Sequence, residues 1–189
     1  IDHELIPDDA HTFWFAIRGS LVEASVWFSG WGLTTGKTAI AVDRFGETAT
    51  LTSSDTTSDA IGNVEKFVLD PSPAITRAGL VQQLAAITQS HRIDENLAFL
   101  SCETEPEDHP LFTTYEVLDS FEFNESKIAD ELVNLKAYDV QIISRGYRGD
   151  VDSLTKKLKK HLKGDKLICL LLARMGDRTV AIFTQRVSS

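Results

Sequence analysis

The sequence predicts an α+β fold, in which a β-rich amino-terminal part precedes a compact β-α-β-α-β-β unit. Short stretches of alternating apolar residues dominate about the first sixty positions, whereas about the last eighty place two helical patterns between strand patterns. Between these parts lies the segment 103–110, with four carboxylates and two prolines. This segment predicts a boundary between a region over 1–110 and a domain over 111–189.

The amino-terminal region is expected to hold several strands and one helix. Gly19-Ser20 separates two strand patterns and favours a β-hairpin, and 50–63 has the Thr, Ser, Asp and Gly content of a surface loop. Pro73 suits the first turn of a helix over Ala74–Thr88, where a proline loses no helical hydrogen bond. The expected strands are Thr12–Arg18, Leu21–Phe28, Thr38–Val42, Thr48–Leu51, Val64–Leu69 and Leu97–Cys102.

The carboxy-terminal unit shows clearer periodicity. Asn124 is placed to cap one helix, and either Asp150 or Asp152 to cap a second helix that continues through Lys163. Apolar residues in both helices recur every three or four positions, so each helix has one inward face. The expected strands are Thr113–Phe123, Tyr138–Ser144, Lys166–Arg174 and Arg178–Arg186, the last two joined by a tight turn over 175–177.

The charge is distributed unevenly along the chain. The net charge of −9 would by itself argue against a nucleic-acid partner. Residues 1–143, however, carry 8 basic and 24 acidic side chains, a net charge of −16, whereas residues 144–189 carry 11 and 4, a net charge of +7. Such asymmetry suggests a local anion-binding face on an otherwise acidic protein.

Seven cations concentrate this positive charge on the second helix and the loop before it. They are Arg145, Arg148, Lys156, Lys157, Lys159, Lys160 and Lys163. Two interpretations stay open. Amphipathic helices often carry lysines on their solvated face, and a basic face can also hold nucleic-acid phosphates, which positions the nucleic acid without reading its sequence.

No motif assigns a catalytic residue or a metal site. The segment from Gly32 to Thr38 resembles a phosphate-binding loop but has three residues between its glycines where four are required, and a strand pattern follows it. Without a glycine-rich turn after a strand, the chain is expected to bind no nucleoside cofactor. The histidines show no metal-ligand spacing; they are His3, His11, His91, His109 and His161.

Two further features bear on location and partners. Cys102 and Cys169 are too few for a disulfide framework, and no apolar run approaches the ~20 residues of a membrane-spanning helix, so a cytoplasmic protein is expected. The first hairpin carries more aromatic surface than one small sheet usually buries. Part of it is expected to be exposed, to cover a neighbouring domain or to form a homodimer contact; the residues are Phe13, Trp14, Phe15, Trp27 and Phe28.

Several stretches resemble one protein family. The segment Asp70-Pro-Ser-Pro-Ala-Ile-Thr-Arg-Ala-Gly-Leu80 resembles the E-P-D-P-A-V-I-R-A-G-L segment of actinobacterial class I S-adenosylmethionine-dependent methyltransferases that end in a THUMP-like domain. Val140 to Gly146 is similar to their strand and R-G turn, and Leu170 to Ile182 to their closing hairpin. Glu23 to Trp27 resembles the segment that follows their catalytic part.

This resemblance implies that the chain is the carboxy-terminal part of a larger methyltransferase. The S-adenosylmethionine-binding catalytic domain would then lie upstream and be a partner in cis, and the chain itself would hold no catalytic residue. Because THUMP domains help RNA-modifying enzymes to present tRNA, the resemblance implies a tRNA or rRNA substrate. We therefore expect an accessory region that positions RNA; the alternative is a protein–protein docking module that binds no RNA.

Overall fold

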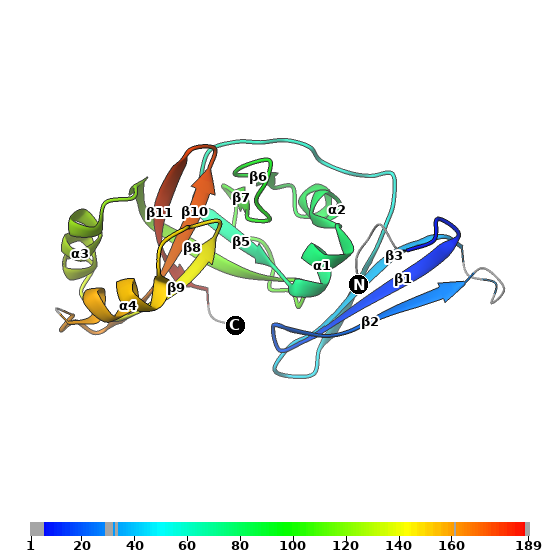
Figure 1. The fold of residues 1–189 in the computed structure, drawn as a ribbon, viewed down its shortest axis with the longest axis horizontal. Helices are drawn as coiled ribbons and strands as arrows, with labels where there is room; N and C mark the ends of the chain where they lie inside the picture. The colour runs from blue at the N-terminus through cyan, green and yellow to red at the C-terminus, as the bar shows by residue number, and fades with distance from the viewer. Residues whose placement is uncertain (1–5, 29–31, 33, 161, 188–189) are drawn as a thin grey trace.

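The protein is described by a computed structural model that covers residues 6–28, 32, 34–160 and 162–187. Its described residues form a four-stranded sheet, a seven-stranded mixed sheet and four helices, which confirms the α+β fold (Figure 1). The first sheet is made entirely by the β-rich amino-terminal part, and the second by residues 67–186. No helix among the described residues is long and apolar enough to cross a membrane.

The four-stranded sheet has the order β2-β1-β3-β4. Its strands are β1 (Ala10–Ile17), β2 (Ser20–Phe28), β3 (Gly36–Val42) and β4 (Thr48–Thr52). The expected hairpin is present: β1 and β2 are antiparallel, and Arg18 and Gly19 form the turn with φ of 51° and 76°. β3 then runs parallel to β1, so the turn after β3 lies at the same end of the sheet as this first turn.

The seven-stranded sheet has the order β6-β7-β5-β8-β11-β10-β9. Its strands are β5 (Phe67–Pro71), β6 (His91–Arg92), β7 (Leu100–Cys102), β8 (Phe112–Glu122), β9 (Ala137–Arg145), β10 (Lys166–Met175) and β11 (Arg178–Arg186). β8 bonds to β5 on one edge and to β11 on the other. The sheet therefore continues across position 110, and the division into 1–110 and 111–189 stays a prediction.

Two expectations about the amino-terminal half are wrong in detail. The single helix expected over Ala74–Thr88 is two short helices, α1 (Pro73–Ala78) and α2 (Val81–Ile87), because Gly79 adopts the left-handed conformation with φ of 70° and ends α1. The strand expected over Val64–Leu69 is β5, which starts later and ends later because its pairing with β8 continues to Pro71.

The helices of the carboxy-terminal unit begin as expected. α3 (Glu125–Asn134) is capped by Asn124, and α4 (Val151–Lys159) by Asp150, whose carboxylate accepts hydrogen bonds from the amides of Asp152 and Ser153 at 3.0 and 3.1 Å. The expectation that this second helix reaches Lys163 is wrong. α4 ends at Lys159, and the chain then turns so that the amide of Gly164 binds the carbonyl of Ala137 at the start of β9.

Both faces of the large sheet are covered. Leu170 and Leu172 of β10 face the side that α3 and α4 cover, whereas Leu171 and Ala173 face a second core under the segment before β7. A strand buried on both faces needs the continuous apolar run that β10 has. A third core joins α1 to the small sheet and includes Trp14. The two sheets are thus connected through packed side chains.

The capping arrangement predicts unequal effects of two similar substitutions. Replacing Asp150 with Ala removes two hydrogen bonds to the first turn of α4, so we expect the free energy of unfolding to fall by about 1 kcal/mol. Asp152→Ala removes the same charge two residues later, in the first turn of α4, without removing the cap, and serves as the control. Urea denaturation measures both, and equal losses in the two variants would contradict the assignment of the cap.

Candidate nucleic-acid interface

Four lysines project from the solvated side of α4 and its end. Leu154 and Leu158 are buried against the sheet, which leaves the charged side chains in solvent. We call these four residues the lysine face; they are Lys156, Lys157, Lys159 and Lys160. Cations in the last turn also interact favourably with the helix dipole, so part of their role is structural.

Two members of the lysine face are engaged in ion pairs. The Nζ atom of Lys157 lies 3.1 Å from Oε1 of Glu125 at the start of α3, and Nζ of Lys159 lies 2.8 Å from Oδ1 of Asp139 on β9. The hydrogen bond from Lys159 also lowers the pKa of Asp139 below its ordinary value. Lys156 and Lys160 form no ion pair with any residue in the described part of the chain. Their positive charges are therefore available to a ligand.

The other three predicted cations lie outside the lysine face, before α4, after it and on β9. Arg148 is exposed in the loop before α4, and Lys163 is exposed beyond the end of the helix. Arg145 is at the far end of β9 from Asp139, six residues or about 20 Å along the strand. Its Nη2 lies 2.8 Å from Oδ1 of Asp70. The structure therefore separates Arg145 from Lys159, with which the sequence had grouped it.

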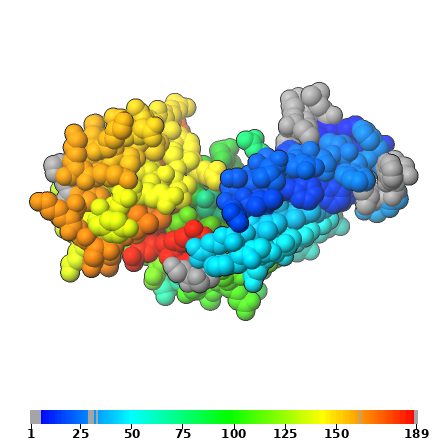
Figure 2. All heavy atoms as spheres, turned by 90° about the horizontal axis from the view of Figure 1, so that it is seen from below, coloured from blue at the N-terminus to red at the C-terminus, as the bar shows by residue number. Residues whose placement is uncertain are grey.

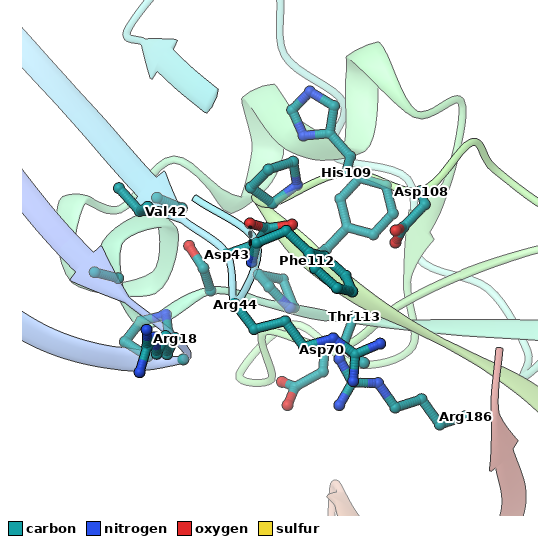
Figure 3. A pocket seen from close by; sticks show the side chains of 18 of the residues that line it. Arg18, Val42, Asp43, Arg44, Asp70, Asp108, His109, Phe112, Thr113 and Arg186 are labelled. Carbon is teal, nitrogen blue, oxygen red and sulfur yellow. Dashed lines mark hydrogen bonds between the residues drawn. The ribbon is translucent and has the colours of Figure 1, made fainter. Parts of the chain in front are cut away.

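Arg145 belongs to a second group of cations, which the sequence did not indicate. A cleft of about 470 Å³ opens between the two sheets and is lined by four arginines. We call it the arginine cleft, after Arg18, Arg44, Arg145 and Arg186. Figure 2 shows the small sheet, in blue and cyan, beside the carboxy-terminal strand, in red. In Figure 3 Arg186 extends from the end of β11 toward Asp70.

Asp70 is the central acidic group of this cleft. Burial raises its pKa above the ordinary value, and the neighbouring Arg145 charge and hydrogen bond act in the opposite direction. The charge of Asp70 also acts on Tyr115. Burial, together with this negative charge, raises the pKa of Tyr115 to about 12. The hydrogen bond that Arg145 donates to Asp70 orients the guanidinium among the residues that line the cleft.

The aromatic surface of the first hairpin is divided between the two faces of the small sheet. Trp14 is buried in the core under α1, whereas Phe13, Phe15 and Trp27 lie on the opposite face, which we call the outer aromatic face. Trp27 packs edge-on against Phe13, with ring centroids 6.4 Å apart, and keeps 43% of its surface exposed. Phe28 is 55% exposed, which confirms that part of this aromatic surface remains accessible.

The described residues contain no group of three or more His, Cys, Asp or Glu side chains that could hold a metal ion. His3 and His161 lie outside the described part. Both cysteines are free and buried, and burial raises the pKa of Cys102 to about 11, so its thiol is a poor nucleophile at neutral pH. Gly36 begins β3 rather than a helix, which confirms the strand expected after the glycine-rich segment.

Comparison with known proteins agrees with the carboxy-terminal topology. Residues 112–186 match the family described as THUMP domain-like. It is also 30% identical over 122 residues to the uncharacterized S-adenosylmethionine-dependent methyltransferases of Mycobacterium tuberculosis strains CDC 1551 and H37Rv.

These relatives are longer than the chain. The alignment covers 65% of the chain but 33% of each mycobacterial protein. A crystal structure of a presumed methyltransferase from Porphyromonas gingivalis W83 has the same fold, with a TM-score of 0.69 and 17% identity over 95% of this chain and 46% of that one. The expected similarities to S-adenosylmethionine-dependent methyltransferases and to the THUMP-like family are confirmed, whereas the actinobacterial origin and the placement of a catalytic domain upstream stay predictions.

The ion pair between Asp70 and Arg145 predicts in which direction the pKa of Asp70 changes when Arg145 is replaced. Arg145→Gln removes the charge and the hydrogen bond that lower the pKa of Asp70, so we expect this pKa, already above 3.8, to rise further. A carboxyl with a raised pKa binds protons more readily in the folded chain. As the pH rises from 3.8 to the pKa of Asp70 in the folded chain, the free energy of unfolding therefore falls. In the variant the folded pKa is higher, so this fall continues to a higher pH.

Carboxyl-carbon NMR titration measures this pKa directly. Lys159→Gln is the matched control, because it should raise the pKa of Asp139 and leave that of Asp70 unchanged. An Asp70 pKa that does not respond to Arg145→Gln would show that the ion pair is absent in solution.

Proposed function

We propose that this chain is an accessory region of an S-adenosylmethionine-dependent methyltransferase and that it positions a tRNA or rRNA substrate for an upstream catalytic domain. The observation that carries the proposal is the lysine face on a THUMP-like domain, where Lys156 and Lys160 lie one helical turn apart without an acidic partner in the described chain. The named methyltransferase relatives support the enzyme class.

Electrostatics govern RNA binding in this proposal. Each phosphate that a lysine or arginine neutralises releases counterions, so affinity is tolerant of sequence and falls with salt. The net charge of −16 on residues 1–143 repels RNA, so contact is expected only where cations are gathered. Arg148 and Lys163 flank the lysine face and extend this contact region. S-adenosylmethionine and the catalytic groups belong to the upstream domain, in a protein that works in the cytoplasm.

The ion pairs provide a matched test of RNA binding. Lys156→Gln with Lys160→Gln removes two unpaired charges, and we expect about tenfold weaker binding of a structured tRNA fragment and a salt slope smaller by about 1.4 to 1.8. Lys157→Gln with Lys159→Gln removes the same charge from residues that already hold carboxylates, so its effect should be smaller. Glutamine preserves helix propensity in both variants.

Fluorescence anisotropy at two salt concentrations measures both quantities, and circular dichroism checks the fold. Wild-type affinity and salt slope in the Lys156/Lys160 variant would show that the lysine face is only a solvated helix surface. RNA positioning by this face would then be refuted.

A second candidate function is docking to the catalytic domain without RNA. The outer aromatic face favours it. On this face Trp27 is 43% exposed, and Ile17, which follows Phe15 on the same side of β1, is 44% exposed. The sheet lacks a covering layer on this side among the described residues, whereas α1 covers its other side. The alignment covers 33% of each mycobacterial relative, and a domain in the part outside the alignment is the partner in this alternative.

This alternative predicts a charge-sensitive contact. Ile17→Glu with Trp27→Glu places two carboxylates on exposed apolar positions, so we expect the chain to fold but to lose binding to the separately purified methyltransferase domain. Val133→Glu is the control, because Val133 is 53% exposed on α3, in the other unit of the molecule. Calorimetry measures both, and unchanged binding by the double variant would exclude docking through this face.

A further inference from the structure

We propose that the arginine cleft binds a nucleotide unit of single-stranded RNA, with its phosphate on the arginines and its base on Phe45. The inference rests on the proposed function for its substrate class and adds a second RNA site, at the junction of the two sheets. The cleft volume of about 470 Å³ lies within the range of about 300–1,000 Å³ that is typical of ligand pockets.

The arginine side chains of the cleft favour an anionic ligand first of all by their charge. The cleft gathers four of the nine arginines of a chain whose net charge is −9. Within the described residues Arg18, Arg44 and Arg186 form no ion pair, and only Arg145 is paired, with Asp70. The guanidinium fork matches the oxygens of a phosphate group, and unpaired arginines leave that capacity unused.

Asp43 and Asp70 accept hydrogen bonds that fix neighbouring groups of the cleft. The carboxylate of Asp43 accepts the amides of Phe45 and Glu47, both at 2.8 Å, and so fixes the turn that carries Arg44. Asp70 holds Arg145. Asp108 is the third acidic residue along the wall. Two of the three carboxylates thus position the turn and the guanidinium that a phosphate would meet.

Backbone conformation is the second argument. Arg18 has a φ of 51° in the two-residue hairpin turn, a position that favours Asn, Asp or Gly. Its amide donates to the carbonyl of Val42 at 2.8 Å, which ties this turn to the end of β3. A long cationic side chain at a position that costs backbone energy is a pattern found at binding sites. Here it places a charge at the rim of the cleft.

An exposed aromatic ring is the third argument. Phe45 lines the cleft and keeps 68% of its surface exposed, and the Arg44 guanidinium lies 4.6 Å from the centre of its ring. On the other wall His109 stacks on Phe112 with centroids 5.8 Å apart. Single-stranded nucleic acids are bound by this combination of cations for the backbone and rings for the bases. Inorganic phosphate has no base that could stack on the exposed ring, so the ring favours a nucleotide unit.

The test uses the purified protein with a fluorescein-labelled ten-nucleotide single-stranded oligoribonucleotide of mixed sequence. Arg44→Gln with Arg186→Gln should weaken its binding about tenfold and reduce the salt slope by about 1.4, since each single-strand contact contributes about 0.7. Phe45→Ala should weaken binding about fivefold or more without changing the salt slope. The control is Arg77→Gln with Arg178→Gln, which removes the same charge from exposed arginines outside the cleft.

Each outcome decides the inference. Loss of binding in the cleft variants with wild-type binding in the control supports it, and equal binding in both overturns it. Adenosine monophosphate that binds as tightly as the oligonucleotide overturns the RNA assignment in favour of a mononucleotide site. If only the Lys156/Lys160 variant loses binding to structured RNA, this inference fails and the proposed function stands; if neither set loses binding, both fail.

Discussion

The arrangement of the molecule depends on β8, whose two edges bond to strands from different parts of the chain. Residues Phe112–Glu116 pair with β5, and the span from Tyr115 to Glu122 pairs with β11. This strand therefore joins the carboxy-terminal unit to the segment before it in one continuous sheet. The small sheet is attached in turn through α1, whose buried side chains contact both sheets. Removing the pairing of β8 would leave two parts without a fixed relation.

This sheet pairing places two basic regions at opposite ends of β9. The lysine face lies over β9 at the end that carries Asp139, and Arg145 marks the arginine cleft at the other end. The cleft itself exists only because the ends of β1 and β3 meet the ends of β5 and β11. A ligand that spans both regions would meet cations near both ends of β9.

The sequence predicts best where a single element carries the signal. The hairpins followed from alternating residues and glycine turns, and the lysine face from the 3.6-residue period of α4, because both patterns are local. The break at Gly79 was missed because the apolar spacing continues into α2 through Leu84, although the glycine was visible. The arginine cleft could not be found this way. Its cations come from turns and strand ends far apart in the chain, and only the tertiary pairing brings them together.

Under the proposed function, the ion pairs of the lysine face affect which polyanions it would bind. A phosphate that contacts Lys157 or Lys159 must first displace a carboxylate, from Glu125 or Asp139, so each such contact is an exchange with little net gain. Small anions would gain almost nothing from this exchange. A polyanion that engages the unpaired lysines at the same time pays the ordering cost once and adds the exchanged contacts at high effective concentration. Under the proposed function, Glu125 and Asp139 therefore make the lysine face prefer a long polyanion to a small anion.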